Sequence, residues 1–405
     1  MILKEDGSVW STSITLHGGH VPSRGSNHFV QVISSGATAV AAGTVYSVAL
    51  KQGGGVWAMG RNAYGQLGDG TRARKDAFFF VKIIPGATTV SAGGRHTMVL
   101  TREGDVWATG WNKYGQLGFE SMVYHTKFSR VVSGAAIALA AGDIHSIVLK
   151  HDGSVWAVGR NNNGQLGDGS KDDRYTFVKV ISIGAADVAA SGYHSMVLKQ
   201  DRSVWVTGWN EYGQLGDGST IDKINYMEVV PDGAMAIAAG SRHSMVLKQD
   251  GSVWTTGYNE YGQLGDGWTS NRMTFVQVLS DEAIAIGAGG YHSMAIKQDG
   301  SIWATGSNKY DQFGDGSSKS ESKFIRLAPF NNGAGHGTIT YTWFTFISAV
   351  FFLNLTNIIH SLADLLSTTK ASSTTTTGRK STRDDRNLPP SKMHLLWIVL
   401  HIRPN

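Results

Sequence analysis

Histidine recurs at a fixed spacing in this 405-residue chain, and histidine is both the commonest acid–base group and a common metal ligand. Each copy is followed by Ser or Thr; the set is His96, His145, His194, His243 and His292. If the copies occupy successive units of a ring, their imidazoles lie much further apart than zinc's ligand distance of about 2.0–2.1 Å allows. We therefore expect no metal site, and we interpret these residues as buried structural histidines that bond backbone or the adjacent hydroxyl within one unit.

A second recurring group is the aspartate of a Gly-Asp-Gly string, which invites a calcium interpretation. The copies are Asp69, Asp168, Asp217, Asp266 and Asp315. Neither the helix-loop-helix calcium pattern nor the glycine-rich nonapeptide is present, so we interpret the carboxylates as turn caps. Because no nucleophile, paired-carboxylate site or phosphate-cradling loop stands out, the sequence predicts no catalytic residues, no cofactor and no enzyme activity.

Seven tryptophans mark the repeating structural elements that position these groups. They recur with gaps of 47, 50, 49, 49, 49 and 49 residues. A fixed period in this range is typical of repeat architectures. We assign a structural role to the last six of these tryptophans, together with the five histidines. The tryptophans are Trp10, Trp57, Trp107, Trp156, Trp205, Trp254 and Trp303.

The sequence of each repeat predicts four short strands. Residues 245–248 and 252–256 form β-branched and aromatic runs, and the pair Asp250-Gly251 between them is a strong hairpin signal. An Ala-rich stretch before each His suits a crowded inner strand, and an alternating run such as 177–181 suits an outer one. Arg202 replaces the turn glycine in one repeat, so we expect that hairpin to be the most strained.

The string Gly-x-Asn-x-Tyr-Gly-Gln-Leu-Gly resembles the signature of the regulator of chromosome condensation (RCC1) repeats. It appears at 60–68, 110–118, 208–216 and 257–265, with variants at 159–167 and 306–314. The resemblance covers residues 1 to about 330 and implies an all-β, seven-bladed β-propeller. The count of seven hairpins in the chain agrees with it.

Closure of the ring is where the sequence departs from the pattern. Residues 1–7 align with 245–251, so the chain begins inside a blade whose Ala-rich strand and His are missing. We predict a propeller over 1–330 with an incomplete first blade, an apolar extension over 331–366 and a disordered Ser/Thr/Lys-rich tail over 367–405. Residues 339–359 carry no charge, which allows either a transmembrane helix or a closing strand.

Composition limits the partners. The net charge is +5, but seven of the 36 Lys/Arg and three of the 31 Asp/Glu lie in 331–405. The propeller therefore has 29 Lys/Arg and 28 Asp/Glu, a net charge of +1. Phosphate-backbone binding needs clustered cations, so nucleic acid is disfavoured for the propeller. The absence of Cys excludes disulfides and thiol chemistry. No signal peptide is recognised, and we expect a cytoplasmic or nuclear monomer, with membrane association through 339–359 as the alternative.

Positions that vary between blades are the best candidates for partner binding. Two positions vary at strand ends: the residue after the Gly that ends each Trp strand, and the residue before each His. Arg, Trp and Tyr are enriched at interface hot spots. The alternative is that these side chains pack between blades. The candidates are Arg61, Trp111, Arg160, Trp209, Tyr258, Arg95, Tyr193, Arg242 and Tyr291.

These observations favour a non-enzymatic scaffold that binds a protein partner through one propeller face. The resemblance implies an alternative, a guanine-nucleotide exchange factor for a Ran-like small GTPase. The exchanger in that family uses a protruding wedge, and the regular spacing here leaves no room for one.

Overall fold

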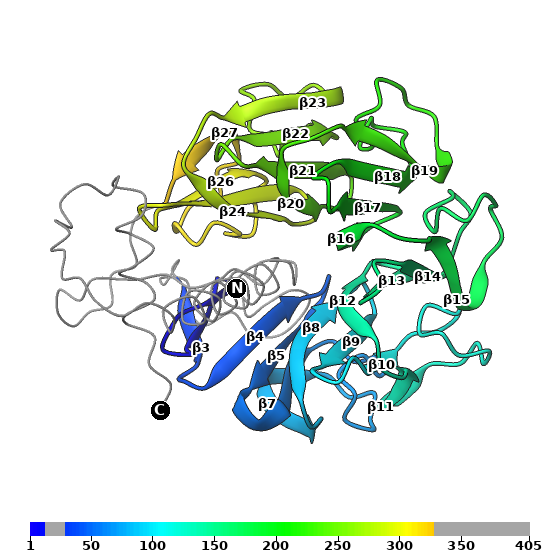
Figure 1. Cartoon of the computed structure of the whole chain (residues 1–405). Helices are drawn as coiled ribbons and strands as arrows, with labels where there is room; N and C mark the ends of the chain where they lie inside the picture. Colours follow the sequence, from blue (N-terminus) through cyan, green and yellow to red (C-terminus); the bar gives the residue numbers. More distant parts are fainter. Residues whose placement is uncertain (13–28, 328–405) are drawn as a thin grey trace, which may run out of the picture. The chain divides into compact units, whose positions relative to one another are not determined.

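The computed structural model describes residues 1–12 and 29–327, and within them the chain forms seven antiparallel β-sheets and a single short 3-10 helix. Figure 1 shows the sheets following one another in sequence order, each as one blade. The chain is therefore a seven-bladed β-propeller, as the sequence predicted.

Blade 1 has three strands and the other six blades have four, which run from the inner strand to the outer one. Blades 1 to 3 are formed by β1 (Ile2–Leu3), β2 (Val9–Ser11) and β3 (Val30–Ile33); β4 (Ala37–Ala42), β5 (Tyr46–Lys51), η1 (Gln52–Gly54), β6 (Gly55–Gly60) and β7 (Lys75–Ile83); and β8 (Ala87–Ala92), β9 (His96–Thr101), β10 (Val106–Gly110) and β11 (His125–Val132).

Blades 4 to 7 repeat this order. They are formed by β12 (Ala136–Ala141), β13 (His145–Lys150), β14 (Val155–Gly159) and β15 (Arg174–Ile181); β16 (Ala185–Ser191), β17 (His194–Lys199), β18 (Val204–Gly208) and β19 (Lys223–Val230); β20 (Ala234–Ala239), β21 (His243–Lys248), β22 (Val253–Gly257) and β23 (Arg272–Leu279); and β24 (Ala283–Ala288), β25 (His292–Lys297), β26 (Ile302–Gly306) and β27 (Glu321–Arg326).

The hairpin between the second and third strands of a blade is held by its turn carboxylate and by the repeated Trp. In blade 4, Asp152 accepts a hydrogen bond from the Ser154 backbone N–H at 2.9 Å, and Trp156 Nε1 donates to Ser154 Oγ at 3.0 Å. The Lys150 ammonium lies 3.9 Å from the centroid of the Trp156 ring. The half-buried tryptophan thus links the turn to the strand that precedes it.

Arg202 has φ of 70° at the position where the other hairpins use glycine, such as Gly251 with φ of 79°. Left-handed backbone at a non-glycine residue costs about 1 kcal/mol or more. We expect Arg202→Gly to raise the free energy of unfolding by about 1 kcal/mol, measured by urea denaturation. Arg202→Ala keeps a Cβ in the same conformation and is the control; an equal gain in both variants would contradict the backbone explanation.

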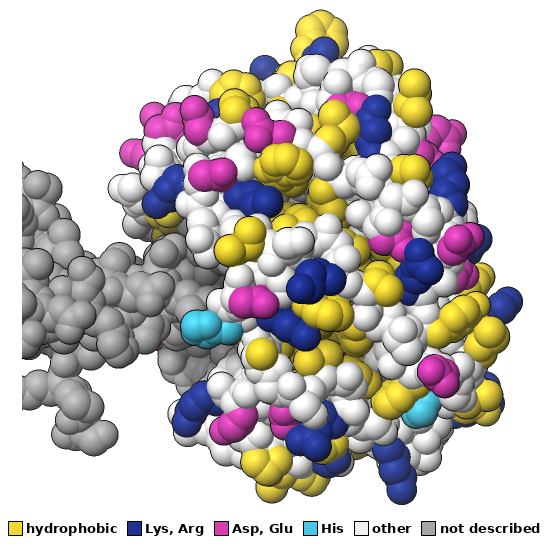
Figure 2. Space-filling model, turned by 45° about the vertical axis from the view of Figure 1, so that its right-hand side comes forward, with side chains coloured by type: hydrophobic (Ala, Val, Ile, Leu, Met, Phe, Trp, Pro, Cys, Tyr) yellow, Lys and Arg dark blue, Asp and Glu magenta, His cyan; other side chains and the backbone are white. Residues whose placement is uncertain are grey.

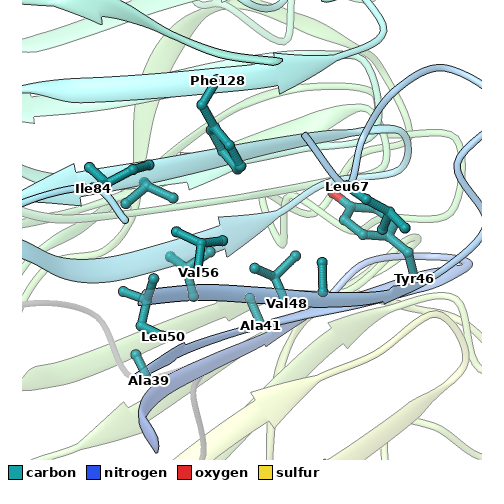
Figure 3. Close-up of a cluster of buried hydrophobic side chains, with 12 residues drawn as sticks. Ala39, Ala41, Tyr46, Val48, Leu50, Val56, Leu67, Ile84 and Phe128 are labelled. Carbon is teal, nitrogen blue, oxygen red and sulfur yellow. The ribbon is translucent and has the colours of Figure 1, made fainter. Parts of the chain in front are cut away.

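Apolar side chains from two blades meet in each interface. Figure 3 shows one such cluster, in which Val48, Leu50 and Val56 of blade 2 lie beneath Phe128 of blade 3. Leu67, from the loop after β6, is fully buried in the same cluster. Blade-to-blade burial therefore supplies much of the hydrophobic stabilisation of the ring.

A glycine covered by an aromatic ring marks the outer part of the six interfaces whose loops the structure describes. A Cβ built on Gly216 would lie 2.5 Å from the Phe275 ring, and one on Gly265 would lie 2.6 Å from Phe324. The same contact joins blade 7 to blade 1, where a Cβ on Gly314 would lie 2.3 Å from Phe29. Ile2, Phe29 and Leu327 share one core cluster, so blades 1 and 7 pack together although the first sheet has three strands.

Some of the sequence expectations fall outside the described residues. The proposed closing strand or membrane span at 339–359 and the tail at 367–405 lie in the part of the chain that the structure leaves undescribed. Among residues 1–12 and 29–327, no helix has the length and apolar character needed to cross a bilayer.

Candidate functional site

The two variable positions of each blade meet on the same side of the propeller. The Trp111 backbone N–H donates to the Arg95 carbonyl at 2.9 Å, and the Tyr258 N–H donates to the Arg242 carbonyl at 2.9 Å. The same bond joins Trp209 to Tyr193. We call this side the loop face; the Asp-Gly hairpins lie at the opposite ends of the same strands, on the hairpin face.

One part of the loop face carries arginines stacked on aromatic rings. The Arg95 guanidinium lies 5.0 Å from the centroid of Tyr64 and 4.9 Å from that of Trp111. The Trp111 and Tyr114 rings are 5.3 Å apart, and the Arg160 guanidinium lies 4.7 Å from Tyr114. We call this group, together with the exposed Arg61, the arginine sector.

The rest of the loop face is dominated by aromatic rings in a continuous series. Trp209 contacts Tyr193 and Tyr212, with centroids 5.6 and 5.3 Å apart. The series continues through pairs separated by 4.8 to 6.3 Å, and the Arg242 guanidinium lies 5.2 to 6.0 Å from four of the rings. We call this group the aromatic sector: Tyr193, Trp209, Tyr212, Arg242, Tyr258, Tyr261 and Tyr291.

The predicted binding residues differ in exposure. Arg61 and Arg95 are exposed, and Tyr291 is 38% exposed. Tyr258 is 9% exposed, and its hydroxyl donates to Glu260. Burial and the Glu260 charge raise the pKa of Tyr258, so this hydroxyl stays protonated. The remaining candidates are half-buried: Trp111, Arg160, Tyr193, Trp209 and Arg242.

Sequence reasoning missed the tyrosine of the repeat signature. Tyr64, Tyr114 and Tyr212 supply the rings on which the predicted arginines stack, and Tyr261 is 43% exposed. These tyrosines occur in nearly every blade and so resembled framework residues. An available signal was the exception in blade 4, where Asn163 stands in place of Tyr.

Four of the five repeated histidines are fully buried and join neighbouring blades. His145 Nε2 bonds Ser195 Oγ of the next blade at 2.8 Å, and Ser195 Oγ donates to the Gln165 carbonyl at 2.6 Å. Since the hydroxyl proton is used on Gln165, Nε2 must carry the proton that His145 donates. The same relay starts from His96, His194 and His243.

The expectation that these histidines bond within one blade was therefore wrong, because the strand of the next blade brings its serine against the ring. Burial lowers the pKa of His96, His145 and His243 to about 3. It lowers the pKa of His194 and His292 to about 4. The Nδ1 atoms of the four relay histidines have no hydrogen-bond partner among the described residues, so a second proton there would be a buried, unpaired charge.

The repeated aspartates cap loops, in agreement with the turn interpretation. Asp168 Oδ1 accepts hydrogen bonds from the Ser170 backbone N–H at 3.0 Å and from Asn161 Nδ2 at 2.9 Å, and Arg174 pairs with Asp168 at 2.6 Å. In the described ranges of the chain, no group of three or more His, Asp and Glu side chains is placed to hold a metal ion.

Comparison with known proteins identifies the family of this propeller. The model of the RCC1-like domain matches residues 1–279, and the RCC1 repeat model matches residues 283–312. The chain belongs to the RCC1-like family. No curated protein sequence matches it.

Three solved structures share the RCC1-like fold of this chain. Human WBSCR16 is 22% identical, with a TM-score of 0.69 over 80% of this chain and 92% of that one. Yeast RCC1 (Prp20) bound to Kap60 is 19% identical, with a TM-score of 0.64 over 72% and 75%. Prp20p from Saccharomyces cerevisiae, described with its binding to Gsp1p and histones, is 21% identical, with a TM-score of 0.63 over 72% and 77%. At these identities the likeness concerns the fold alone.

Proposed function

We propose that this RCC1-like propeller is a non-enzymatic scaffold that binds a protein partner through its loop face. The observation that carries the proposal is the joined arrangement of arginines and aromatic rings, which come from separate blades and meet on one side. Such side chains bury large areas at low entropic cost and are enriched among hot spots.

The packing between these rings supports the proposal. Ring-on-ring and arginine-on-ring contacts fix the side chains before a partner arrives, which reduces the entropy lost on binding. The outward surface remains available, since Tyr261 and Tyr291 are 43% and 38% exposed. The sequence analysis treated packing between blades and partner binding as alternatives for these side chains. The same side chains can do both.

The test truncates three rings of the face, of which Tyr291 is exposed and Trp111 and Trp209 are half-buried. We expect the variant Trp111→Ala/Trp209→Ala/Tyr291→Ala of the full chain to lose at least tenfold in captured partner, because hot-spot side chains are worth about 2 kcal/mol or more each. Proteins captured from cell lysate are quantified by mass spectrometry. Tyr258 is left unchanged because it is 9% exposed and its truncation would test packing instead.

The control is Ile183→Ala. Ile183 is 71% exposed and lies between β15 and β16, on the hairpin face. Circular dichroism confirms that both variants are folded. Capture that is equal for the triple variant and the wild type would exclude the loop face as the binding surface.

A second candidate function is nucleotide exchange on a small GTPase, which is motivated by the binding of Gsp1p described for Prp20p. In the six blades with described loops, the segment after the Trp strand has the same length: 61–74, 111–124, 160–173, 209–222, 258–271 and 307–320. None of these six carries an inserted wedge. Capture with EDTA is compared with capture in magnesium and GTP; a GTPase enriched only with EDTA would favour exchange over simple binding.

A further inference from the structure

The central arginines of the loop face differ from the peripheral arginines in their partners. Within residues 1–12 and 29–327, no ion pair involves Arg61, Arg95 or Arg160. Five arginines of the outer strands and the loops leading into them are paired with carboxylates: Arg74, Arg130, Arg174, Arg272 and Arg326. Arg72, in one of these loops, instead lies 4.5 Å from the centroid of the Tyr124 ring. Most guanidinium groups at the rim are thus paired with a carboxylate, whereas none of the three in the arginine sector is.

Stacking fixes the orientation of two of these arginines, Arg95 and Arg160. A guanidinium that lies on an aromatic ring uses its flat face for that contact and keeps N–H donors at its edge, which suit a carboxylate. Arg160 Nη1 donates to the Tyr114 hydroxyl at 3.2 Å, and Arg95 makes a longer contact of 3.4 Å with Tyr64. Each guanidinium has further donors that these contacts do not use.

One carboxylate lies near the sector without neutralising it. Asp143 is close enough to Arg95 for the two charges to interact, but no ion pair of 4.0 Å or less joins them. Burial raises the pKa of Asp143, which outweighs the opposing effect of Arg95. No ion pair therefore occupies the N–H donors of Arg95 in the part of the chain that the structure describes.

We propose that the arginine sector binds an acidic, extended segment of a protein partner, whose carboxylates bond the edges of Arg61, Arg95 and Arg160. This inference rests on the proposed function and adds the chemistry of the partner. The aromatic sector, on the same face, then takes apolar side chains of the same segment, since its Tyr261 and Tyr291 are exposed.

Nucleic acid is the competing anionic ligand, and the charge distribution disfavours it. A phosphate chain requires several clustered cations along its path. Glu211 and Glu260 are exposed on the aromatic sector and would repel it. Figure 2 shows that, on the side of the molecule in view, basic side chains are interspersed with apolar and acidic ones and form no continuous positive stripe.

A random 12-residue peptide library, selected on the immobilised full chain, tests the inference. We expect the selected peptides to be enriched in Asp and Glu. Fluorescence anisotropy of the consensus peptide should show about tenfold weaker binding for each of Arg61→Ala, Arg95→Ala and Arg160→Ala, the size expected for a hydrogen bond to a charged group. Binding should also weaken with added salt. Arg130→Ala, which removes the same charge from the ion pair with Asp105, is the matched control and should leave affinity unchanged.

Several results would overturn the inference. The first is a selection that yields no peptide, or peptides without an excess of Asp and Glu. The second is equal peptide binding by the wild type and the arginine variants. The third is a competing ligand: a 20-nucleotide single-stranded DNA that displaces the peptide at a concentration lower than that of the peptide, or a second copy of the chain in a dimer that the arginine variants abolish. Neutral peptides that require Trp209 and Tyr291 would leave the proposed function standing. If capture from lysate is also independent of the loop face, the proposed function fails as well.

Discussion

Lowering the pH from 7 to 5 is expected to decrease the free energy of unfolding by of the order of 8 kcal/mol, because the four relay histidines cannot accept protons while the propeller is folded. Burial lowers the pKa of His96, His145 and His243 to about 3 and that of His194 to about 4. Unfolded histidine titrates near pH 6.5, so both states are neutral above that value.

The sign follows from which state binds protons. Below about pH 6.5 only the unfolded state takes them up, and each histidine then removes about 1.4 kcal/mol of stability per pH unit until its folded pKa is reached. Urea midpoints followed by tryptophan fluorescence between pH 7.5 and 4.5 measure the effect.

Matched histidine variants separate the relay from other titrating groups. His145→Gln keeps a polar side chain in the interface and should flatten the pH dependence while lowering stability at pH 7.5. His151 is exposed, and His151→Gln should reproduce the wild-type curve. A pH dependence that is unchanged in His145→Gln would show that acid acts elsewhere.

A methyl group at Gly216 is expected to destabilise the propeller by about 3 kcal/mol, from left-handed backbone strain of about 1–2 kcal/mol and from overpacking. Gly216 has φ of 75°, and its Cβ would lie 2.5 Å from the Phe275 ring and 3.1 Å from Thr256. Neither neighbour is the free end of a flexible side chain. Thermal unfolding of Gly216→Ala by circular dichroism gives the loss.

Gly36 offers a control with the same backbone strain and open space. Its φ is 76°, and a Cβ there would meet nothing within 4 Å. Gly36→Ala should therefore cost only the backbone part, about 1 kcal/mol. Adding Phe275→Leu to Gly216→Ala should recover part of the difference. Equal losses at the two glycines would contradict the interface explanation.

The regular part of the fold was predictable because local signals carry it. Asp-Gly pairs between β-branched runs predicted the hairpins, and the period of 49 residues predicted the blades. Arg202 was expected to be strained and has the positive φ that this position requires. These features depend on a few neighbouring residues, so the sequence is enough to recognise them.

Contacts between repeats were harder to predict. The partner of His96 is Ser146, 50 residues away, whereas an adjacent hydroxyl at Thr97 offered an equally simple explanation from the sequence. Periodicity cannot distinguish a contact inside one repeat from the same contact made to the next repeat. Whether Tyr258 packs between blades or faces a partner stayed open for a similar reason, because its neighbours Tyr212 and Tyr291 come from other blades.

The glycine-on-ring contact has a consequence for assembly. It is heterologous, since a glycine of one blade meets an aromatic ring of the following one, and head-to-tail interfaces form a closed ring where the rotation between units closes and an open filament where it does not. The contact of Gly314 in blade 7 with Phe29 in blade 1 joins the last blade to the first. A chain cut between two blades would expose one glycine surface and one ring surface that fit each other, and such fragments would be expected to join end to end into open fibres or exchange blades between molecules.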